Sequence, residues 1–408
     1  MNRRDLLKTP LLLGAGTLPA AEEFPKPDLG GIYDIVDWTA RQSRLALSFL
    51  DPKWKSLEEW KKTARPFYRR LLAYDPPAAP LGAEMLGREE RDGFSIERVK
   101  IRATGAYDIP GWLLIPSKRS GRLPGVVAIH CHGGNYVFGH EKLISSPTEP
   151  EAAVQYRARG YQRPYTEYLV RRGFIVLVID GFYFGSRRLK VESLDRATVP
   201  SGLRQYVDAV AALPPGTTRW YAAINRACSE FEHLTAKTIF TAGATWPGML
   251  AWDDMRSVDY LCSRPEVDAA RIGCVGLSIG GLRAAHLIAA DPRIKTACVV
   301  GWMTEFQTQL RNHLRSHTWM IYIPGLYSAM DLPDAAGMMA PNALFVQQCA
   351  QDRLYPMAGM KGSVAKLAKI YAKAGAPDRF RSAFYDVPHS FTPDMQEEAF
   401  DWLEKWLT

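Results

Sequence analysis

The sequence lacks the motifs that bind nucleotides and nucleic acids. Neither a Walker motif nor a GxGxxG after a strand-like run occurs in its 408 residues, so a nucleotide cofactor is not indicated. Its basic pairs are scattered and do not alternate with aromatic residues along one stripe, which argues against a nucleic-acid partner. A heptad repeat is also absent. With 47% hydrophobic residues, 23% charged residues and a net charge of +8, the composition is that of an ordinary globular protein.

Cysteine is also scarce, with six residues in the chain. Four of them lie in or beside predicted central strands, where cysteine acts as a small buried hydrophobic residue. A chain of this length buries enough apolar surface to fold without cross-links. We therefore expect free thiols, while a disulfide between Cys228 and Cys262 stays open.

No cluster of cysteine, histidine and carboxylate residues has the spacing of a metal site. His130 and His132 share one face of a predicted strand, but no third ligand accompanies them. His313 and His317 have the i, i+4 spacing of a shared helix face and are interpreted as a solvated or capping pair. The sequence therefore indicates neither a metal nor another cofactor.

The apolar run at the amino end is too short to serve as a stable membrane anchor. It follows Arg3 and Arg4 in the pattern Arg-Arg-x-Leu-Leu-Lys, which is typical of a twin-arginine export signal. Residues 1–21 are therefore predicted to be such a signal, and the protein is expected to be exported to the periplasm. The run has neither a clear A-x-A cleavage site nor a cysteine for a lipid anchor.

The sequence does contain one motif of high value, Gly-Leu-Ser-Ile-Gly at 276–280. This G-x-S-x-G stands between a strand-like run at 271–275 and a helix-like run at 280–290. Such a context predicts a sharp turn that exposes the hydroxyl of Ser278 as a nucleophile. The residues two before and two after the serine pack against each other in such a turn, and glycine meets that demand at both positions.

A nucleophilic serine needs a base, and His389 is the predicted base. It follows the strand-like run 379–387, and the loop at the end of a strand is where a base can meet Ser278. His286 also follows the serine in the chain. However, it lies on the helix that starts at the motif and cannot easily turn back to it.

The base in turn needs an acid that orients it, and Asp352 is the predicted acid. It lies in the loop after the strand-like run 342–349, in the chain order Ser, Asp, His. Glu305 competes with it, since it follows the preceding strand-like run. Asp386 is close to His389 in the sequence but belongs to a strand, so the direction of its side chain is open.

The oxyanion formed by the attack needs preorganised N–H donors. One is predicted to be the amide of Ile279, the residue after the nucleophile. The other is expected from the loop after the strand-like run 124–130, where a His-Gly-Gly sequence permits unusual backbone angles. Gly133, Gly134 and Asn135 are all candidates for this second donor.

The alternation of strand-like and helix-like runs predicts an α/β protein with a mostly parallel, doubly wound sheet and an antiparallel edge. After the signal, residues 22–90 are predicted to be mostly helical, and residues 91–408 to form the catalytic domain. The helix-like stretch 187–250 interrupts the alternation and is expected to be a cap over the active site. Strands are expected near 94–104, 111–116, 125–131, 174–180, 271–275, 296–301, 342–349 and 380–387.

These residues together resemble the α/β-hydrolase superfamily, and most closely its acetyl-xylan-esterase-like and dienelactone-hydrolase-like branch. The likeness is carried by 252–281, by the Cys-His-Gly-Gly-Asn loop at 131–135 and by Val-Ile-Asp-Gly-Phe-Tyr-Phe-Gly-Ser at 178–186, and it extends over about 90–408. It implies an α/β-hydrolase fold and a carboxylic ester substrate. It also implies that Ser278, with Asp352 and His389, occupies the triad positions.

At two positions the chain differs from particular members of this branch. Dienelactone hydrolases use a cysteine nucleophile where this chain has Ser278, and glucuronoyl esterases carry an arginine where it has Ile279. The expected function is therefore an exported carbohydrate esterase of the acetyl-xylan type, acting on a small-molecule or polysaccharide ester. A prolyl-oligopeptidase-like peptidase and a non-catalytic protein on a hydrolase scaffold are the alternatives. The sequence gives no indication of oligomeric state.

Overall fold

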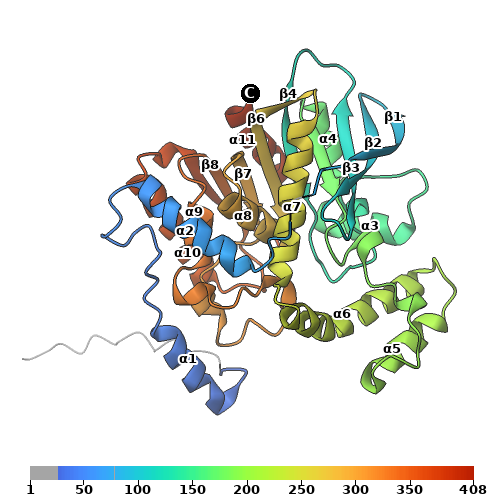
Figure 1. Ribbon diagram of the computed structural model, residues 1–408, viewed down its shortest axis with the longest axis horizontal. Coiled ribbons are helices and arrows are strands. Elements are labelled where there is room, and N and C mark those ends of the chain that lie inside the picture. The colour runs from blue at the N-terminus through green and yellow to red at the C-terminus, as the bar shows by residue number, and fades with distance from the viewer. Residues whose placement is uncertain (1–25, 78) are drawn as a thin grey trace, which may run out of the picture.

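The computed structural model describes residues 26–77 and 79–408, which form one large sheet flanked by helices (Figure 1). The predicted signal at 1–21 lies outside the described residues. The sheet has nine strands in the order β1-β2-β3-β5-β4-β6-β7-β8-β9. The strands are β1 (Glu84–Arg91), β2 (Phe94–Arg102), β3 (Asp108–Pro116), β4 (Leu123–Ile129), β5 (Ile175–Ile179), β6 (Val267–Leu277), β7 (Ile294–Val300), β8 (Ala343–Cys349) and β9 (Phe380–Tyr385).

The predicted sheet is confirmed in its type and in its strands. Strands β1, β2, β3 and β5 pair in antiparallel fashion, and the pairs from β5 through β9 are parallel. All eight strands expected from the sequence are present. Strands β5, β7 and β8 are almost continuous runs of buried apolar residues, as parallel strands covered on both faces require.

The first strand was not foreseen, because its residues fall in the segment predicted to be mostly helical. Strand β1 has the sequence Glu-Met-Leu-Gly-Arg-Glu-Glu-Arg and lies at the edge of the sheet, with most of its side chains exposed. An exposed edge strand buries no face, so its sequence lacks the apolar alternation by which a strand is predicted. The boundary expected at 90/91, between the helical segment and the catalytic domain, thus falls at the end of this strand.

Helices cover both faces of the sheet (Figure 1). Helices α7 and α8 pack on one face, and α4 and α11 on the other. The helices are α1 (Tyr33–Arg41), α2 (Leu57–Leu72), α3 (Glu151–Gly160), α4 (Tyr165–Arg171), α5 (Ser201–Ala211), α6 (Thr218–Thr241), α7 (Trp246–Ser263), α8 (Ile279–Ala290), α9 (Leu332–Gly337), α10 (Met357–Lys373) and α11 (Pro393–Leu407). No helix among residues 26–77 and 79–408 combines the length and the apolar character needed to cross a membrane.

Helix α2 docks the amino-terminal segment onto α7 and α8. Its buried residues Trp60, Ala64, Tyr68 and Leu72 recur every four positions and so lie on one helix face. The hydroxyl of Ser56 caps the helix by accepting a hydrogen bond from the amide of Glu59 at 3.1 Å. The segment is therefore held by an apolar stripe with a defined start.

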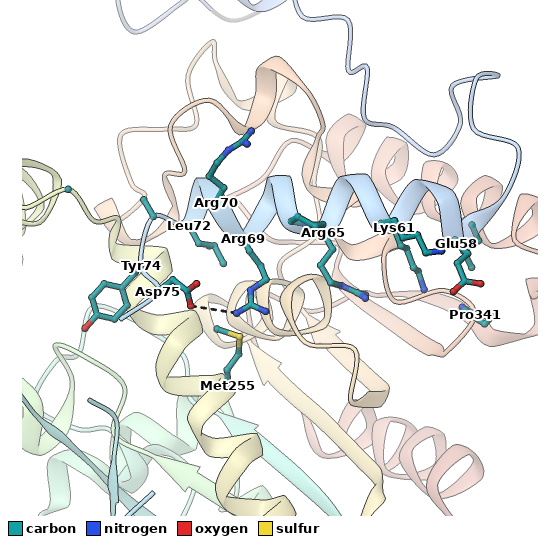
Figure 2. A pocket seen from close by; sticks show the side chains of 15 residues that line it. Glu58, Lys61, Arg65, Arg69, Arg70, Leu72, Tyr74, Asp75, Met255 and Pro341 are labelled. Carbon is teal, nitrogen blue, oxygen red and sulfur yellow. Dashed lines mark ion pairs between the residues drawn. The ribbon is translucent and has the colours of Figure 1, made fainter. Parts of the chain in front are cut away.

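A groove of about 1240 Å³ runs beside α2, and it is not the site of the predicted chemistry (Figure 2). Two of its basic side chains hold carbonyls at helix ends. Arg65 donates to Ala289 and Met338 at 2.9 and 3.1 Å, and Lys61 donates to Ala340. Arg69 forms an ion pair with Asp75 at 3.7 Å. Arg65 and Lys61 thus serve the docking of α2, and Arg69 ties α2 to the loop that follows it.

Candidate active site

Ser278 occupies the turn between β6 and α8 that the motif predicted. Its backbone has φ 62° and ψ −126°, a conformation that costs energy for any residue with a side chain. The turn is held by the Ser278 amide, which donates to the carbonyl of Val300 on the neighbouring strand at 2.8 Å. The serine thus stands at the carboxyl end of the central strands, where ligands bind in open α/β sheets.

The glycines around Ser278 are required by contact distances. A Cβ on Gly276 would lie 2.4 Å from the backbone of Gly280, and one on Gly280 would lie 2.3 Å from the carbonyl oxygen of Ile129. A Cβ on Gly281 would lie 2.7 Å from the carbonyl oxygen of Val300. A Cβ at such distances would clash with backbone atoms that cannot move without distorting the sheet. The turn therefore accepts only glycine at these positions.

His389 and Asp352 form a hydrogen-bonded pair next to this turn. The imidazole Nδ1 lies 2.5 Å from Oδ2 of Asp352, whose other oxygen accepts from the amide of Leu354 at 2.9 Å. This pairing favours the tautomer with a proton on Nδ1, which leaves Nε2 with a free lone pair. Nε2 has no hydrogen-bond partner within the described part of the chain. In catalytic sites without substrate, the hydrogen bond between the base and the nucleophile is often long, and it shortens when substrate binds.

The two other carboxylates considered for the acid point elsewhere. Glu305 lies against α10, where a Cβ on Gly362 would meet its Oε2 at 2.1 Å. Asp386 accepts a hydrogen bond from the exposed side chain of Gln351. Among the candidates, only Asp352 is bonded to His389.

Ser278 and His389 line one cavity of about 220 Å³. Its walls come from the loops after β4, β7, β8 and β9, all at the carboxyl ends of strands, and from the turn of Ser278 itself. The lining residues are His132, Gly133, Gly134, Ser278, Ile279, Trp302, Ser316, His317, Thr318, Leu354, Tyr355 and His389. The ring of His389 lies over Gly301, where a Cβ would come within 3.2 Å of Cε1. The cavity therefore brings together most of the residues that the sequence selected.

The loop after β4 presents its glycines to this cavity, with φ of 56° at Gly133 and 65° at Gly134. The structure discriminates among the three candidate donors. The amide of Gly134 donates to Nδ1 of His132 at 2.9 Å, and that of Asn135 to the carbonyl of His132 at 3.1 Å. The amide of Gly133 has no such partner within the described residues. On the other side, Ile279 is the first residue of α8, where amides have no partner inside the helix.

The insertion 187–250, expected to be a cap, contributes none of the residues that line the cavity. It contains α5 and α6, which extend away from the sheet in Figure 1, and its last residues already belong to α7. It reaches the rim through the buried Glu232 of α6. This carboxylate is bonded to Nε2 of His132 at 3.2 Å and to the hydroxyl of Thr318 at 2.7 Å. The insertion thus supports the walls, and the segment after β7 closes the cavity.

His317 was interpreted wrongly from the sequence. Residues 310–317 form turns and bends, so His313 and His317 do not share a helix face. His317 lines the cavity instead, stacked on Tyr355 with 5.3 Å between ring centroids. Burial lowers its pKa to about 4, so the ring is neutral at physiological pH. No sequence signal marked it, because the segment lacks regular periodicity.

One group of potential metal ligands lies outside this cavity. Atoms of His140, Glu141 and Asp180 lie within 4.8 Å of one another. Both oxygens of the buried Asp180 accept protein hydrogen bonds, from the amide and ring of His140 and from the amide and hydroxyl of Ser186. These contacts join the loop after β4 to the loop after β5. All six cysteines are free in the structure.

The parallel sheet with its antiparallel edge, the serine turn and the reactive loops at the strand ends define an α/β-hydrolase fold. No protein-family model matches the sequence. The chain is 27% identical over 339 residues to a protein of Bacillus subtilis (strain 168) named "Putative hydrolase YtaP", which covers 83% of this chain and 97% of that protein.

Solved structures share the fold at low sequence identity. An acetyl xylan esterase of Bacteroides fragilis NCTC 9343, described as putative, superimposes with a TM-score of 0.63 at 16% identity, covering 87% of this chain and 82% of that one. A glucuronoyl esterase from Solibacter usitatus gives a TM-score of 0.58 at 14% identity, with 87% and 94% covered. These likenesses confirm the predicted fold.

Proposed function

We propose that this protein is a serine hydrolase that cleaves carboxylic esters through an acyl-enzyme. The observation that carries the proposal is one cavity that contains Ser278 on a strained turn and the His389 ring, which is bonded to the buried Asp352. A strained serine and an oriented imidazole with a free Nε2 are the parts that nucleophilic catalysis requires.

The geometry assigns a role to each part. Nε2 of His389 takes the proton of Ser278 as its oxygen attacks the ester carbonyl, and Asp352 stabilises the imidazolium that results. The amides of Ile279 and Gly133 stabilise the oxyanion, and the amino end of α8 adds a favourable dipole. His389 then protonates the leaving alcohol. Water repeats the sequence on the acyl-enzyme and releases the acid.

The substrate is proposed to be an ester of a carbohydrate. Trp302, His317 and Tyr355 pack around the cavity, and within residues 26–77 and 79–408 the indole N–H, imidazole Nε2 and phenol hydroxyl have no hydrogen-bond partner. Aromatic rings whose polar atoms have no partner in the described part of the chain suit a ligand that carries both a ring and hydroxyl groups. The similarity to an acetyl xylan esterase and a glucuronoyl esterase supports the same class.

Comparative hydrolysis tests the proposal. Purified protein is assayed with acetylated xylan, a 4-nitrophenyl acetate, a glucuronoyl methyl ester and a proline-containing peptide. The expected result is release of acetate from the first two, which is lost in Ser278→Ala. Cleavage of the peptide alone would favour the peptidase alternative, and turnover unaffected by Ser278→Ala would contradict the proposal.

We further propose export by the twin-arginine route, on the sequence of residues 1–21 alone. Fractionation of the producing cells checks this. The wild-type protein is expected in the periplasm, and the variant with Arg3→Lys and Arg4→Lys is expected to stay in the cytoplasm. Equal distribution of the two proteins would count against the signal.

A further inference from the structure

A buried lysine lies behind the loop that carries the oxyanion donor. Lys142 follows the loop after β4, and its side chain is fully buried. Its ammonium donates to the carbonyls of Cys131, His132 and Asn135, at 2.7, 3.1 and 2.7 Å. No carboxylate forms an ion pair with it within the described residues. A buried cation without a counter-ion is expensive, so its retention calls for a reason beyond packing.

These three bonds help to fix the direction of the peptide groups in the loop. The His132 carbonyl also accepts from the Asn135 amide at 3.1 Å and from the Tyr156 hydroxyl at 3.4 Å. In a trans peptide the C=O and the N–H point in opposite directions. The Asn135–Tyr136 peptide shows the effect, because its carbonyl accepts from Lys142 while its N–H donates away from the lysine to Asn225 of α6 at 2.8 Å. By the same geometry, the His132–Gly133 peptide turns its carbonyl to Lys142 and its N–H to the opposite side.

We propose that Lys142 is a positioning residue of the oxyanion hole, because its ammonium is the one charged group that holds the His132 carbonyl among the described residues and so presents the Gly133 amide to the cavity of Ser278. A cation on the carbonyl also polarises the peptide and makes its N–H a stronger donor. The inference rests on the proposed ester hydrolysis and deepens it. Lys142 touches neither the substrate nor the reacting atoms, and acts through one peptide group.

The protonation of Lys142 gives the arrangement a pH dependence. Burial lowers its pKa to about 8, and Arg283 adds to this, while the nearby Cys131, Glu141 and Asp180 oppose it. The rings of Tyr156 and Phe184 face the ammonium at 5.4 and 4.7 Å. Above a pH of about 8 the cation is lost, and with it the polarisation of the His132 carbonyl. We therefore expect kcat to fall on the alkaline side.

The test is Lys142→Met, which keeps the length of the side chain and removes the ammonium. Its matched control is Lys366→Met, since Lys366 forms a mostly buried ion pair with Asp334 at 2.6 Å, away from the loop. With 4-nitrophenyl acetate at pH 7, Lys142→Met is expected to lower kcat about 100-fold, as the loss of one oxyanion donor does, with little change in KM. Lys366→Met is expected to lower the melting temperature but to leave kcat and KM unchanged.

The dependence of kcat on pH distinguishes a positioning role of Lys142 from a role in the stability of the fold. The wild-type kcat is expected to fall above a pH of about 8, and the profile of Lys142→Met is expected to be flat there. A folded Lys142→Met with wild-type kcat and an unchanged alkaline limb would overturn the inference. Should Lys142→Met not fold, the wild-type profile decides, and a kcat that is constant to pH 10 overturns it. These results can be told apart from a failure of the proposed function, because in that case the wild-type protein itself would not hydrolyse the ester.

Discussion

His389 depends on Asp352 for its orientation, since its Nδ1 has that carboxylate as its partner at 2.5 Å. We predict that Asp352→Asn lowers kcat by roughly 10³- to 10⁴-fold, because an amide no longer favours the tautomer with Nε2 free. Glu305→Gln is the matched control and is expected to change kcat by less than about threefold, since Glu305 lies against α10. Steady-state kinetics on both variants decides, and the opposite ranking would make Glu305 the acid.

Gly280 lies against the end of β4, where a Cβ would come within 2.3 Å of the carbonyl oxygen of Ile129 and 2.9 Å of that of His130. Gly280→Ala is therefore expected to lower the free energy of unfolding by about 3 kcal/mol or more. Gly202→Ala on the exposed α5 has nothing within 4 Å of the new methyl group and should be neutral or stabilising by up to about 1 kcal/mol. Urea titrations measure both, and equal effects would refute the packing argument.

At the scale of single residues, Ser278, Asp352 and His389 could be predicted because each follows a strand-like run. Ser278 and Asp352 follow the largely buried strands β6 and β8, and His389 follows the edge strand β9. It could not choose among Gly133, Gly134 and Asn135. The choice depends on which amides are already bonded, and those bonds are made by the imidazole and carbonyl of His132. Such hydrogen bonds form only in the folded loop and cannot be predicted from the spacing of residues or from the composition.

At the scale of elements, the docking of α2 on α8 contains a pH-sensitive contact. The hydroxyl of Tyr68 is hydrogen-bonded to Nδ1 of the fully buried His286, and burial lowers the pKa of His286 to about 3. An unfolded histidine binds a proton below a pH of about 6.5, whereas the folded one stays neutral. The unfolded state therefore binds more protons between these values, and stability is lost as the pH falls.

His286→Gln tests this contact, because glutamine keeps an acceptor for Tyr68 and cannot be protonated. The wild-type free energy of unfolding is expected to drop between pH 7 and pH 5, with about 2 kcal/mol of the drop due to His286. The drop should be smaller by that amount in the variant. Urea unfolding at the two pH values gives the comparison, and an identical drop in both proteins would show that His286 does not titrate as the structure implies.

Two elements escaped prediction for the same physical reason. Strand β1 is exposed at the sheet edge, and the cavity wall at 302–318 consists of turns and one short 3-10 helix, Phe306–Gln309, so neither has the periodicity that reveals a buried face. The insertion 187–250 did show helical periodicity, but where its helices pack depends on tertiary contacts such as that of Glu232 with His132. Its position beside the cavity could therefore not be derived from its pattern.

At the scale of the whole molecule, the described residues bury three large apolar clusters, and no disulfide links them. All six cysteines are free, and five of them are buried. We predict that a reducing agent leaves the melting temperature unchanged and that six thiols react with a thiol reagent after denaturation. A structural disulfide would contribute about 2–4 kcal/mol, so a marked drop under reducing conditions would reveal one.

The central claim is that Ser278 is the nucleophile of an ester hydrolase. It is tested most directly by labelling with a fluorophosphonate probe, followed by mass spectrometry of the peptides. The account predicts one adduct, on Ser278, that is absent from a folded Ser278→Ala variant and reduced in Asp352→Asn. A wild-type protein that hydrolyses esters but stays unlabelled at Ser278, or carries the adduct on another residue, would contradict it.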